Sequence, residues 1–194
     1  MSANGIIVKG LTVRGGIEYT ISAVGRTSGA VRNNKVISTC AGAEYGVNVY
    51  GSGSILVVGN EGTGFDDAVI YIGGIGSTPS GPLKVKSNNT HNSARGIIIE
   101  DSSNVNIKVL QNNVHDTTDT GILIHNSDEI LIRGNTVTNN TTNGIHLDSP
   151  SDGNIVLNNT FTGQTNDINN EGTGNCFSGN TYVTVSGDVS MACL

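Results

Sequence analysis

The amino-acid sequence predicts an all-β chain, wound as a single-stranded parallel β-helix of about eight stacked turns. Three observations predict it: a composition unsuited to helices, a phrase that recurs along the chain, and a second phrase that follows it. The 194 residues include 27 Gly and no Trp, with only 4% aromatic and 13% charged residues. Such a chain cannot fill a globular core with large rings, and its length fits one domain or one repeat array.

The first phrase is clearest as Ile130-Leu-Ile-Arg-Gly-Asn135-Thr-Val137. Aligning its copies brings one site into register, with steps from 21 residues (Asn159 to Asn180) to 28 residues (Asn60 to Asn88). That site holds Leu11, Asn34, Asn60, Asn88, Asn112, Asn135, Asn159 and Asn180. Asparagine tolerates left-handed turns and can bond to the residues above and below it, so we expect a structural ladder without chemistry.

The second phrase follows the middle copies of the first after a polar turn. Its copies begin at Gly46, Ala68, Gly96, Gly121 and Gly144, and each continues with apolar residues at alternate positions. Each unit therefore carries at least two short strands, which can bury their apolar face only by stacking in parallel on the next unit.

The repeats resemble those of right-handed parallel β-helix proteins, namely pectate-lyase-like proteins, polygalacturonases, mannuronan C5-epimerases and NosD-type periplasmic proteins. The resemblance covers nearly the whole chain and implies a right-handed coil with a third short strand per turn. Thr63-Gly-Phe-Asp-Asp-Ala68 shares Gly64, Phe65 and Asp66 with a phrase of the epimerases, whose catalytic Tyr and His positions hold Thr63 and Ala68 here. The fold is common to many activities.

The ends of the chain differ from the repeat. We expect the β-helix over residues 1–186 and a capping tail over 187–194, with a disulfide between Cys176 and Cys193 that places the protein in an oxidising compartment, secreted, periplasmic or at the cell surface. Cys40 is expected to be a small buried apolar residue. The first turn begins without a capping helix, which predicts either a preceding segment in a parent protein or an edge contact with a partner.

The charges of the chain indicate which kinds of ligand it could bind. The formal net charge of -6 argues against general nucleic-acid binding, and no run approaches the roughly 18 apolar residues of a membrane span. One outward site nevertheless holds Lys9, Arg32, Lys86 and Arg133, and the site two residues earlier holds Lys84 and Lys108. These rows predict binding of an acidic polysaccharide, with Lys84, Lys86, Lys108 and Arg133 as substrate-binding residues; the alternative is solubility and edge protection.

A second outward row could carry catalysis. The alignment groups Tyr50, Ile72, Glu100, His125 and Asp148, with His146 two residues before the last of these. Carboxylates that flank a histidine raise its pKa and orient its ring, as a general acid or base requires. The alternative is a solvated row of favourable charge pairs.

A third cluster lies in the turn before the same strand. The alignment places Asp66 and Asp67 level with Ala94 and Arg95, followed by Asp119 and Thr120, and it stacks His91 on His115. Paired carboxylates near an arginine could bind calcium or act as acid and base on a sugar. A salt bridge between Asp67 and Arg95 is the alternative.

Two functions follow from these rows. The first is a lyase or epimerase acting on an acidic polysaccharide, with His125 or His146 as base, Asp148 and Glu100 as orienting groups, and Arg95 or calcium at Asp66 and Asp67 as neutraliser of the uronate. Two long repeat steps, around residues 39–45 and 73–82, could wall its groove. The second is a non-catalytic binding or structural module from a larger surface or fibre protein.

Overall fold

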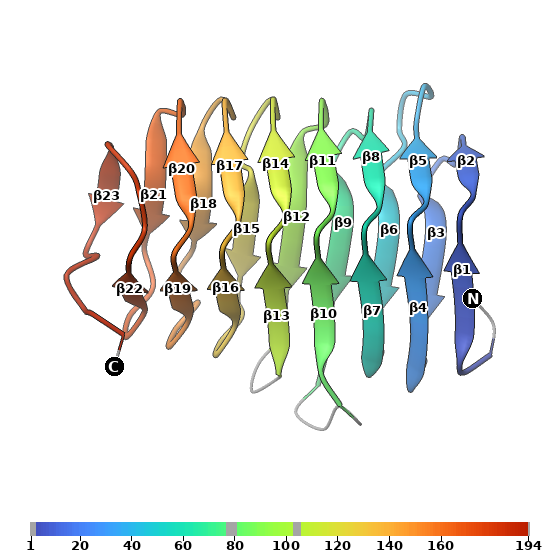
Figure 1. The fold of residues 1–194 in the computed structure, drawn as a ribbon, viewed down its shortest axis with the longest axis horizontal. Helices are drawn as coiled ribbons and strands as arrows, with labels where there is room; N and C mark the ends of the chain where they lie inside the picture. Colours follow the sequence, from blue (N-terminus) through green and yellow to red (C-terminus); the bar gives the residue numbers. More distant parts are fainter. Residues whose placement is uncertain (1–2, 77–80, 103–105, 194) are drawn as a thin grey trace.

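The computed structural model describes residues 3–76, 81–102 and 106–193. Over these residues the chain forms strands and no helix, and the strands form three parallel sheets, which we call sheets A, B and C (Figure 1). No helix that could span a membrane is present in this part of the chain.

Each sheet takes one strand from each turn. Sheet A contains β1 (Ile6–Lys9), β4 (Ser28–Arg32), β7 (Ser54–Val58), β10 (Leu83–Lys86), β13 (Ile107–Leu110), β16 (Leu131–Arg133), β19 (Ile155–Leu157) and β22 (Cys176–Ser178). Sheet B contains β2 (Thr12–Arg14), β5 (Lys35–Ile37), β8 (Glu61–Thr63), β11 (Asn89–His91), β14 (Asn113–His115), β17 (Thr136–Thr138) and β20 (Thr160–Thr162). Sheet C contains β3 (Tyr19–Val24), β6 (Tyr45–Tyr50), β9 (Ala68–Gly73), β12 (Arg95–Glu100), β15 (Ile122–His125), β18 (Asn143–Leu147), β21 (Asn166–Asn170) and β23 (Val185–Gly187).

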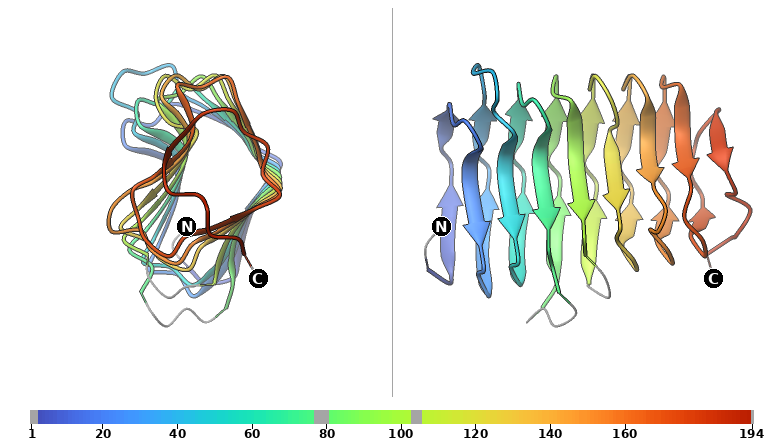
Figure 2. Two further views of the ribbon diagram at one scale, coloured as in Figure 1. Left: turned by 90° about the vertical axis from the view of Figure 1, so that its left-hand side faces the viewer. Right: turned by 180° about the vertical axis from the view of Figure 1, so that it is seen from behind.

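The described chain makes about seven turns, slightly fewer than the predicted eight. The first repeated phrase supplies the strands of sheets A and B, and the second supplies sheet C, so the expected third strand per turn is present. Viewed along the axis, the turns superimpose around a common interior (left panel of Figure 2). Sheets A and B lie on one side of this interior and sheet C on the other (Figure 1).

The predicted asparagine ladder lies at the corner between sheets A and B. The side-chain amide of each asparagine donates to the Oδ1 of the next, as from Asn88 to Asn112 at 3.0 Å and from Asn112 to Asn135 at 2.9 Å. The same Nδ2 of Asn112 donates to the carbonyl of Val85, and its Oδ1 accepts the backbone N–H of Asn88. Every polar atom of a buried rung is therefore satisfied, as burial requires. The ladder is confirmed from Asn34 to Asn180.

The interior is filled by aliphatic side chains from all three sheets. Valine and isoleucine dominate one continuous core, and Phe65 and Phe161 are its largest fully buried rings. Because equivalent residues repeat every turn, each buried side chain packs on its counterparts above and below.

One turn departs from the predicted register. Arg95 pairs with Ala68 and Ile97 with Ile70, so Val69, and not Ala68, lies level with the glycine that opens the second phrase in the other turns. The predicted alignment placed Ala68 level with that glycine and was therefore wrong by one residue. For the same reason, its placement of Ile72 in the outward row and of Asp67 level with Arg95 was wrong by one residue.

A glycine and a larger residue have exchanged places across the core at this turn. A Cβ on Gly96 would lie 2.3 Å from Cγ1 of Val114, and one on Gly121 would lie 2.5 Å from Cγ1 of Val137. In the turn that contains β8 and β9, the glycine is instead Gly62 of sheet B, and Val69 of sheet C faces it. A Cβ on Gly62 would lie 2.0 Å from Cγ1 of Val69. In these turns one of the two facing positions is a glycine, and when the glycine changes sheet the sequence phrase that marks the register changes with it.

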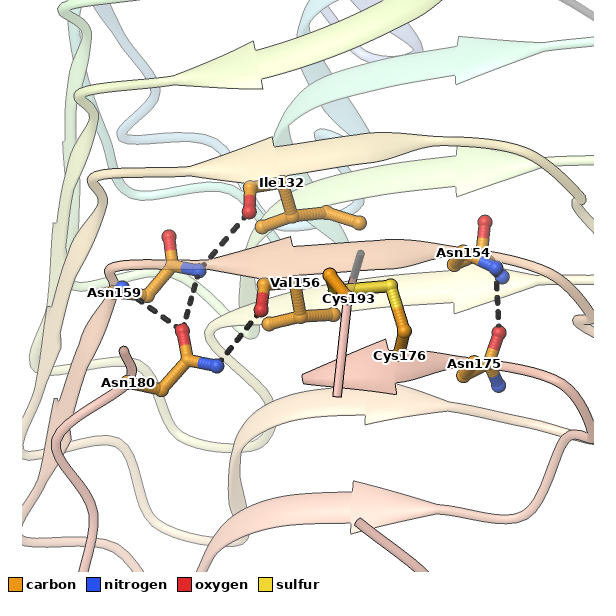
Figure 3. The surroundings of a disulfide bond; sticks show 8 residues. All are labelled: Ile132, Asn154, Val156, Asn159, Asn175, Cys176, Asn180 and Cys193. Atoms are coloured by element: carbon orange, nitrogen blue, oxygen red, sulfur yellow. Dashed lines mark hydrogen bonds between the residues drawn. A yellow bond between two sulfur atoms is a disulfide. The ribbon is translucent and has the colours of Figure 1, made fainter. Parts of the chain in front are cut away.

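The C-terminal end of the solenoid carries the predicted disulfide. Cys176 of β22 is bonded to Cys193 (Figure 3). The tail in between donates and accepts hydrogen bonds with the last turn, as from the Phe177 N–H to the Met191 carbonyl at 2.7 Å. Val189 packs against the core. Leu194 lies outside the described residues, and the boundary at residue 186 stays a prediction.

The expectation for Cys40 was wrong. Its thiol is free and exposed, because Cys40 lies in the loop that follows β5, outside the strand pattern that directs alternate side chains inward. Of the two long repeat steps, that around residues 39–45 forms this outer loop. The second, around residues 73–82, includes positions 77–80 outside the described residues.

The exchanged pair predicts a strong coupling between Gly62 and Val69. Gly62→Val alone forces an overlap and Val69→Gly alone leaves a cavity, and we expect each to lower the free energy of unfolding by about 2 kcal/mol or more. The double variant recreates the arrangement of the neighbouring turns, so we expect a favourable coupling energy of about 1–3 kcal/mol in urea unfolding. Val137→Ala, several turns away, is the control and should add to Gly62→Val without coupling. Additive losses in the Gly62→Val/Val69→Gly double variant would contradict the exchange.

Candidate functional site

The outer face of sheet C gathers the predicted catalytic residues in one row. Register pairing runs from Tyr50 to Gly73, from Gly73 to Glu100 and from Glu100 to His125. Gly73 occupies the place predicted for Ile72, whose side chain is fully buried. The order of Glu100, His125 and Asp148 along the axis is as predicted.

His125 lies between its two carboxylates. Its Nδ1 is hydrogen-bonded to Oδ2 of Asp148, and its Nε2 lies 3.7 Å from Oε1 of Glu100. Asp148 is held in turn by the backbone N–H of Asn126 at 3.1 Å and by the hydroxyl of Ser151 at 3.0 Å. The predicted row of favourable charge pairs is therefore present, with the histidine ring oriented by a fixed carboxylate and its side chain 45% exposed.

Two opposing effects act on the pKa of His125. Partial burial lowers the pKa, while the hydrogen bond and negative charge of Asp148, together with the charge of Glu100, raise it by more. The pKa is raised overall, so the imidazolium is favoured. A histidine in this state can donate a proton or bind an anionic group, and its neutral form can accept a proton.

His146 lies apart from this set. It is on the neighbouring row, level with Leu123 and Asn169, and its Nε2 lies 3.1 Å from Oε1 of Glu171. The structure therefore brings Glu100, His125 and Asp148 together and gives His146 a carboxylate partner of its own.

Arg95 is engaged by aspartates on both sides. Its Nη1 lies 2.5 Å from Oδ1 of Asp67 and its Nε lies 3.0 Å from Oδ2 of Asp119, which confirms the salt bridge named as an alternative. Arg95 begins β12 and Glu100 ends it, so five residues, or roughly 17 Å of strand, separate the proposed neutraliser from the His125 row. The structure does not bring these two groups together.

The aspartates predicted for calcium also have other partners. Oδ2 of Asp67 accepts the Tyr45 hydroxyl at 2.8 Å, and Oδ2 of Asp66 accepts the Gly42 N–H at 2.5 Å. No group of three or more potential metal-ligating side chains is present in the described residues. These contacts engage both carboxylate oxygens of Asp67 and one of Asp66. Calcium binding at this pair stays a prediction.

The predicted histidine stack lies on sheet B. The rings of His91 and His115 are parallel, with centroids 5.0 Å apart. Nε2 of His91 lies 3.7 Å from Glu61, and Nδ1 of His115 lies 2.7 Å from Asp116. This pair is on a different sheet from His125.

The basic rows lie on sheet A with the predicted register. Lys9 pairs with Arg32 and Lys84 pairs with Lys108, while Val58 and Leu110 separate Arg32, Lys86 and Arg133. Over the described residues, none of these six cations forms an ion pair, and Nε of Arg32 is buried without a hydrogen-bond partner. Since sheets A and C lie on opposite sides of the interior, the predicted binding and catalytic residues face different directions (Figures 1 and 2).

A group of tyrosines on sheet C was missed from the sequence. Tyr19 and Tyr45 stack with ring centroids 5.9 Å apart, and Tyr45 and Tyr71 lie 4.5 Å apart. With Tyr50 they line a groove of about 390 Å³. Part of the signal was available, because Tyr19 and Tyr45 are 26 residues apart and pair in register. Tyr71 is level with Asn48, so it contacts Tyr45 diagonally and not along a row. We call these four residues the tyrosine groove.

The fold and its surfaces define a three-sheeted parallel β-helix with one basic face. A family model described as "Right handed beta helix region" matches residues 1–161, and the chain belongs to this family. The predicted right-handed coil is thereby confirmed. No curated protein sequence matches the chain significantly.

A solved structure shares the fold. The A-module of the mannuronan C-5 epimerase AlgE6 from Azotobacter vinelandii superimposes with a TM-score of 0.76 at 13% sequence identity. The match covers 97% of this chain and 56% of that one, so the chain spans about half the length of the epimerase module. At this identity the similarity is one of fold.

The environment of His125 predicts a raised pKa that depends on Asp148. Asp148→Asn removes the carboxylate that raises the pKa, so we expect the His125 pKa to fall and the stability that the ion pair adds to disappear. That stability is full below the ordinary histidine pKa of about 6.5 and is lost as the pH rises through the raised folded value. A histidine-ring NMR titration measures the pKa, and Glu18→Gln controls for net charge. An unchanged His125 pKa in Asp148→Asn would contradict this account.

Proposed function

We propose that the protein binds an acidic polysaccharide along the outer face of sheet A. The observation that carries this proposal is the separation of charge between faces. The strands of sheet A contain six of the ten Lys and Arg residues of the chain and no Asp or Glu. A chain with a net charge of -6 thus has one sheet whose charged strand residues are all positive.

The alternative of edge protection does not account for this face. Lys84 and Lys86 are on β10 and Lys108 is on β13, in the middle of the sheet, where both strand edges are already paired. Lysines that protect an edge belong on the outermost strands. Unpaired cations on central strands instead remain available to the carboxylates of a ligand.

The spacing of the cations suits a linear polymer. Arg32, Lys86 and Arg133 recur at every second turn, which corresponds to about 10 Å along the axis and is comparable with the length of a disaccharide. Between Lys86 and Arg133, a groove of about 240 Å³ is lined by Leu110, Gln111, Arg133 and Gly134. An apolar floor between charges can hold a sugar ring while the cations hold its carboxylates.

Two further findings support the proposal. The AlgE6 A-module, named as a mannuronan epimerase, shows that this fold can serve a protein that modifies a polysaccharide. The disulfide between Cys176 and Cys193 is typical of secreted, periplasmic or cell-surface proteins, where such polymers occur. We therefore propose an extracytoplasmic location.

Neutralising two cations tests the proposal. Lys86→Gln/Arg133→Gln removes charges on both sides of the Leu110 groove, and we expect about tenfold weaker binding of oligomannuronate and oligogalacturonate in calorimetric titrations. The wild-type affinity should fall with added salt, because the contacts are between exposed charges.

The matched control removes two charges from sheet B. Arg14→Gln/Lys35→Gln changes the net charge equally, and it should leave the affinity within about twofold, after allowance for long-range screening. Equal losses in both double variants would show that net charge, and not the face of sheet A, governs binding. Absence of binding to either oligouronate at low salt would contradict the proposal outright.

Catalysis at His125 is a second candidate, which the Glu100, His125 and Asp148 arrangement favours. A lyase or epimerase acting on a uronate requires a base near the acidic proton and a cation at the carboxylate. His125 offers the first, but Arg95 is bound to two aspartates and lies toward the other end of the strand. Non-catalytic binding is therefore the better supported function.

A turnover assay separates the two candidates. Incubation with oligouronates, with and without calcium, should yield neither unsaturated products by ultraviolet absorbance nor a changed epimer ratio by NMR. Turnover that is abolished in His125→Ala, while glycan binding is unchanged, would instead establish the enzyme. Asn126→Ala, beside the same histidine, is the control for local disturbance.

A further inference from the structure

The tyrosine groove is a built cavity on sheet C. Tyr45 and Tyr50 mark the two ends of β6, and Asn48 lies between them, buried and hydrogen-bonded to Ser22 at 3.2 Å. Tyr19 extends the wall into the first turn and Tyr71 into the next. The volume of about 390 Å³ falls within the range of roughly 300–1,000 Å³ typical of small-molecule sites.

Glycines hold two of the rings against the backbone. A Cβ on Gly73 would lie 2.5 Å from Cε1 of Tyr71, and one on Gly74 would lie 2.7 Å from Cζ of Tyr50. Each ring therefore packs closely over a glycine, in space that a side chain at that position would share. Tyr19 and Tyr50 still leave 41% and 49% of their surface exposed. Exposed aromatic rings in fixed positions are suited to stacking on a ligand.

Carboxylates surround the groove. The Tyr45 hydroxyl donates to Asp67 and the Tyr71 hydroxyl donates to Oε2 of Glu100 at 2.7 Å. Burial, with these hydrogen bonds, raises the pKa of both tyrosines, so the phenols remain neutral donors. Glu44 also lines the groove, is exposed, and has no side-chain partner among the described residues. The described residues that line it include no Lys or Arg, and the cation next to it is Arg26, whose Nε donates to the Val24 carbonyl at 2.6 Å.

We infer that the tyrosine groove binds uncharged pyranose units of a glycan. The rings offer apolar faces to the C–H side of a sugar, and the carboxylates and Asn48 offer acceptors and donors to its hydroxyls. A uronate would bring its negative charge close to Glu44 and Glu100, with no Lys or Arg among the described lining residues, and is therefore disfavoured. This site is on the opposite side of the interior from the basic face, so it does not depend on acidic-polysaccharide binding there.

Tyrosine fluorescence tests the site directly, because the chain has no Trp and four of its five tyrosines line the groove. The wild-type protein is titrated with neutral hexasaccharides of the cello, manno, xylo and malto series, and with hexamers of mannuronate and galacturonate. We expect at least one neutral oligosaccharide to change the emission saturably and both oligouronates to leave it unchanged.

Two exposed rings supply the variants. Tyr19→Ala and Tyr50→Ala should each weaken neutral-sugar binding about three- to tenfold, because each removes one stacking surface. Tyr182→Ala, at the other end of the solenoid, is the control and should retain wild-type affinity. Calorimetry gives the affinities independently of the tyrosine signal, and urea unfolding verifies that each variant is folded.

The outcomes separate this site from the basic face. Lys86→Gln/Arg133→Gln should leave neutral-sugar binding unchanged, and a saturating oligouronate should not displace the neutral sugar. Absence of binding by every neutral oligosaccharide, or tyrosine emission that responds to an oligouronate and loses that response in Tyr50→Ala, would overturn the inference. Equal losses in Tyr50→Ala and Tyr182→Ala would also overturn it.

Discussion

The hydrogen-bonded asparagine ladder fixes the register between turns, and both candidate surfaces depend on that register. Each buried amide joins three turns: it donates to the asparagine ahead and to a carbonyl in the turn behind, as Asn112 does with Asn135 and Val85. A slip of one residue would leave several buried polar atoms without partners at once, and each would cost about 1–3 kcal/mol. The rows on the outer faces inherit their order from this corner.

The outer surfaces show how one scaffold carries opposite chemistries. Sheet A has cations without carboxylates, while sheet C combines carboxylates, tyrosines and His125 within a few turns. The formal net charge of the whole chain therefore does not describe the charge of either face. A prism with well-separated faces can therefore meet two different ligands, or two parts of one heterogeneous polymer, without either surface neutralising the other.

The fold was predictable because its signal is repeated. Six consecutive asparagine contacts give the same register, and the basic rows of sheet A follow from it without error. The prediction failed at β9, where the glycine moved from one side of the core to the other and the sequence phrase retained its appearance. Gly62 and Val69 fit together in size across the packed interior, and the sequence of either strand alone does not reveal this.

The candidate site was only partly predictable. Neighbours along a row, such as Glu100 and His125, follow from the repeat, whereas contacts that run diagonally do not. The bonds of Arg95 to both Asp67 and Asp119, and of Tyr71 to Glu100, depend on where long side chains lean. Tyr71 was missed for the same reason, because it is level with Asn48 and contacts Tyr45 diagonally.

The asparagine ladder also has an electrical direction. Each buried rung accepts with its Oδ1 from the rung before it and donates one N–H of its Nδ2 to the rung after it, so the amide-to-amide hydrogen bonds all run in one direction and polarise one another. Leu11 caps the oxygen end through its backbone N–H, while Asn180, the last rung in the described residues, keeps the backward bond of the earlier rungs, from its NH₂ group to the Val156 carbonyl. A turn added beyond Asn180 would continue the ladder only if it presented an acceptor there. Growth of the solenoid at that end is thus restricted by polarity as well as by shape.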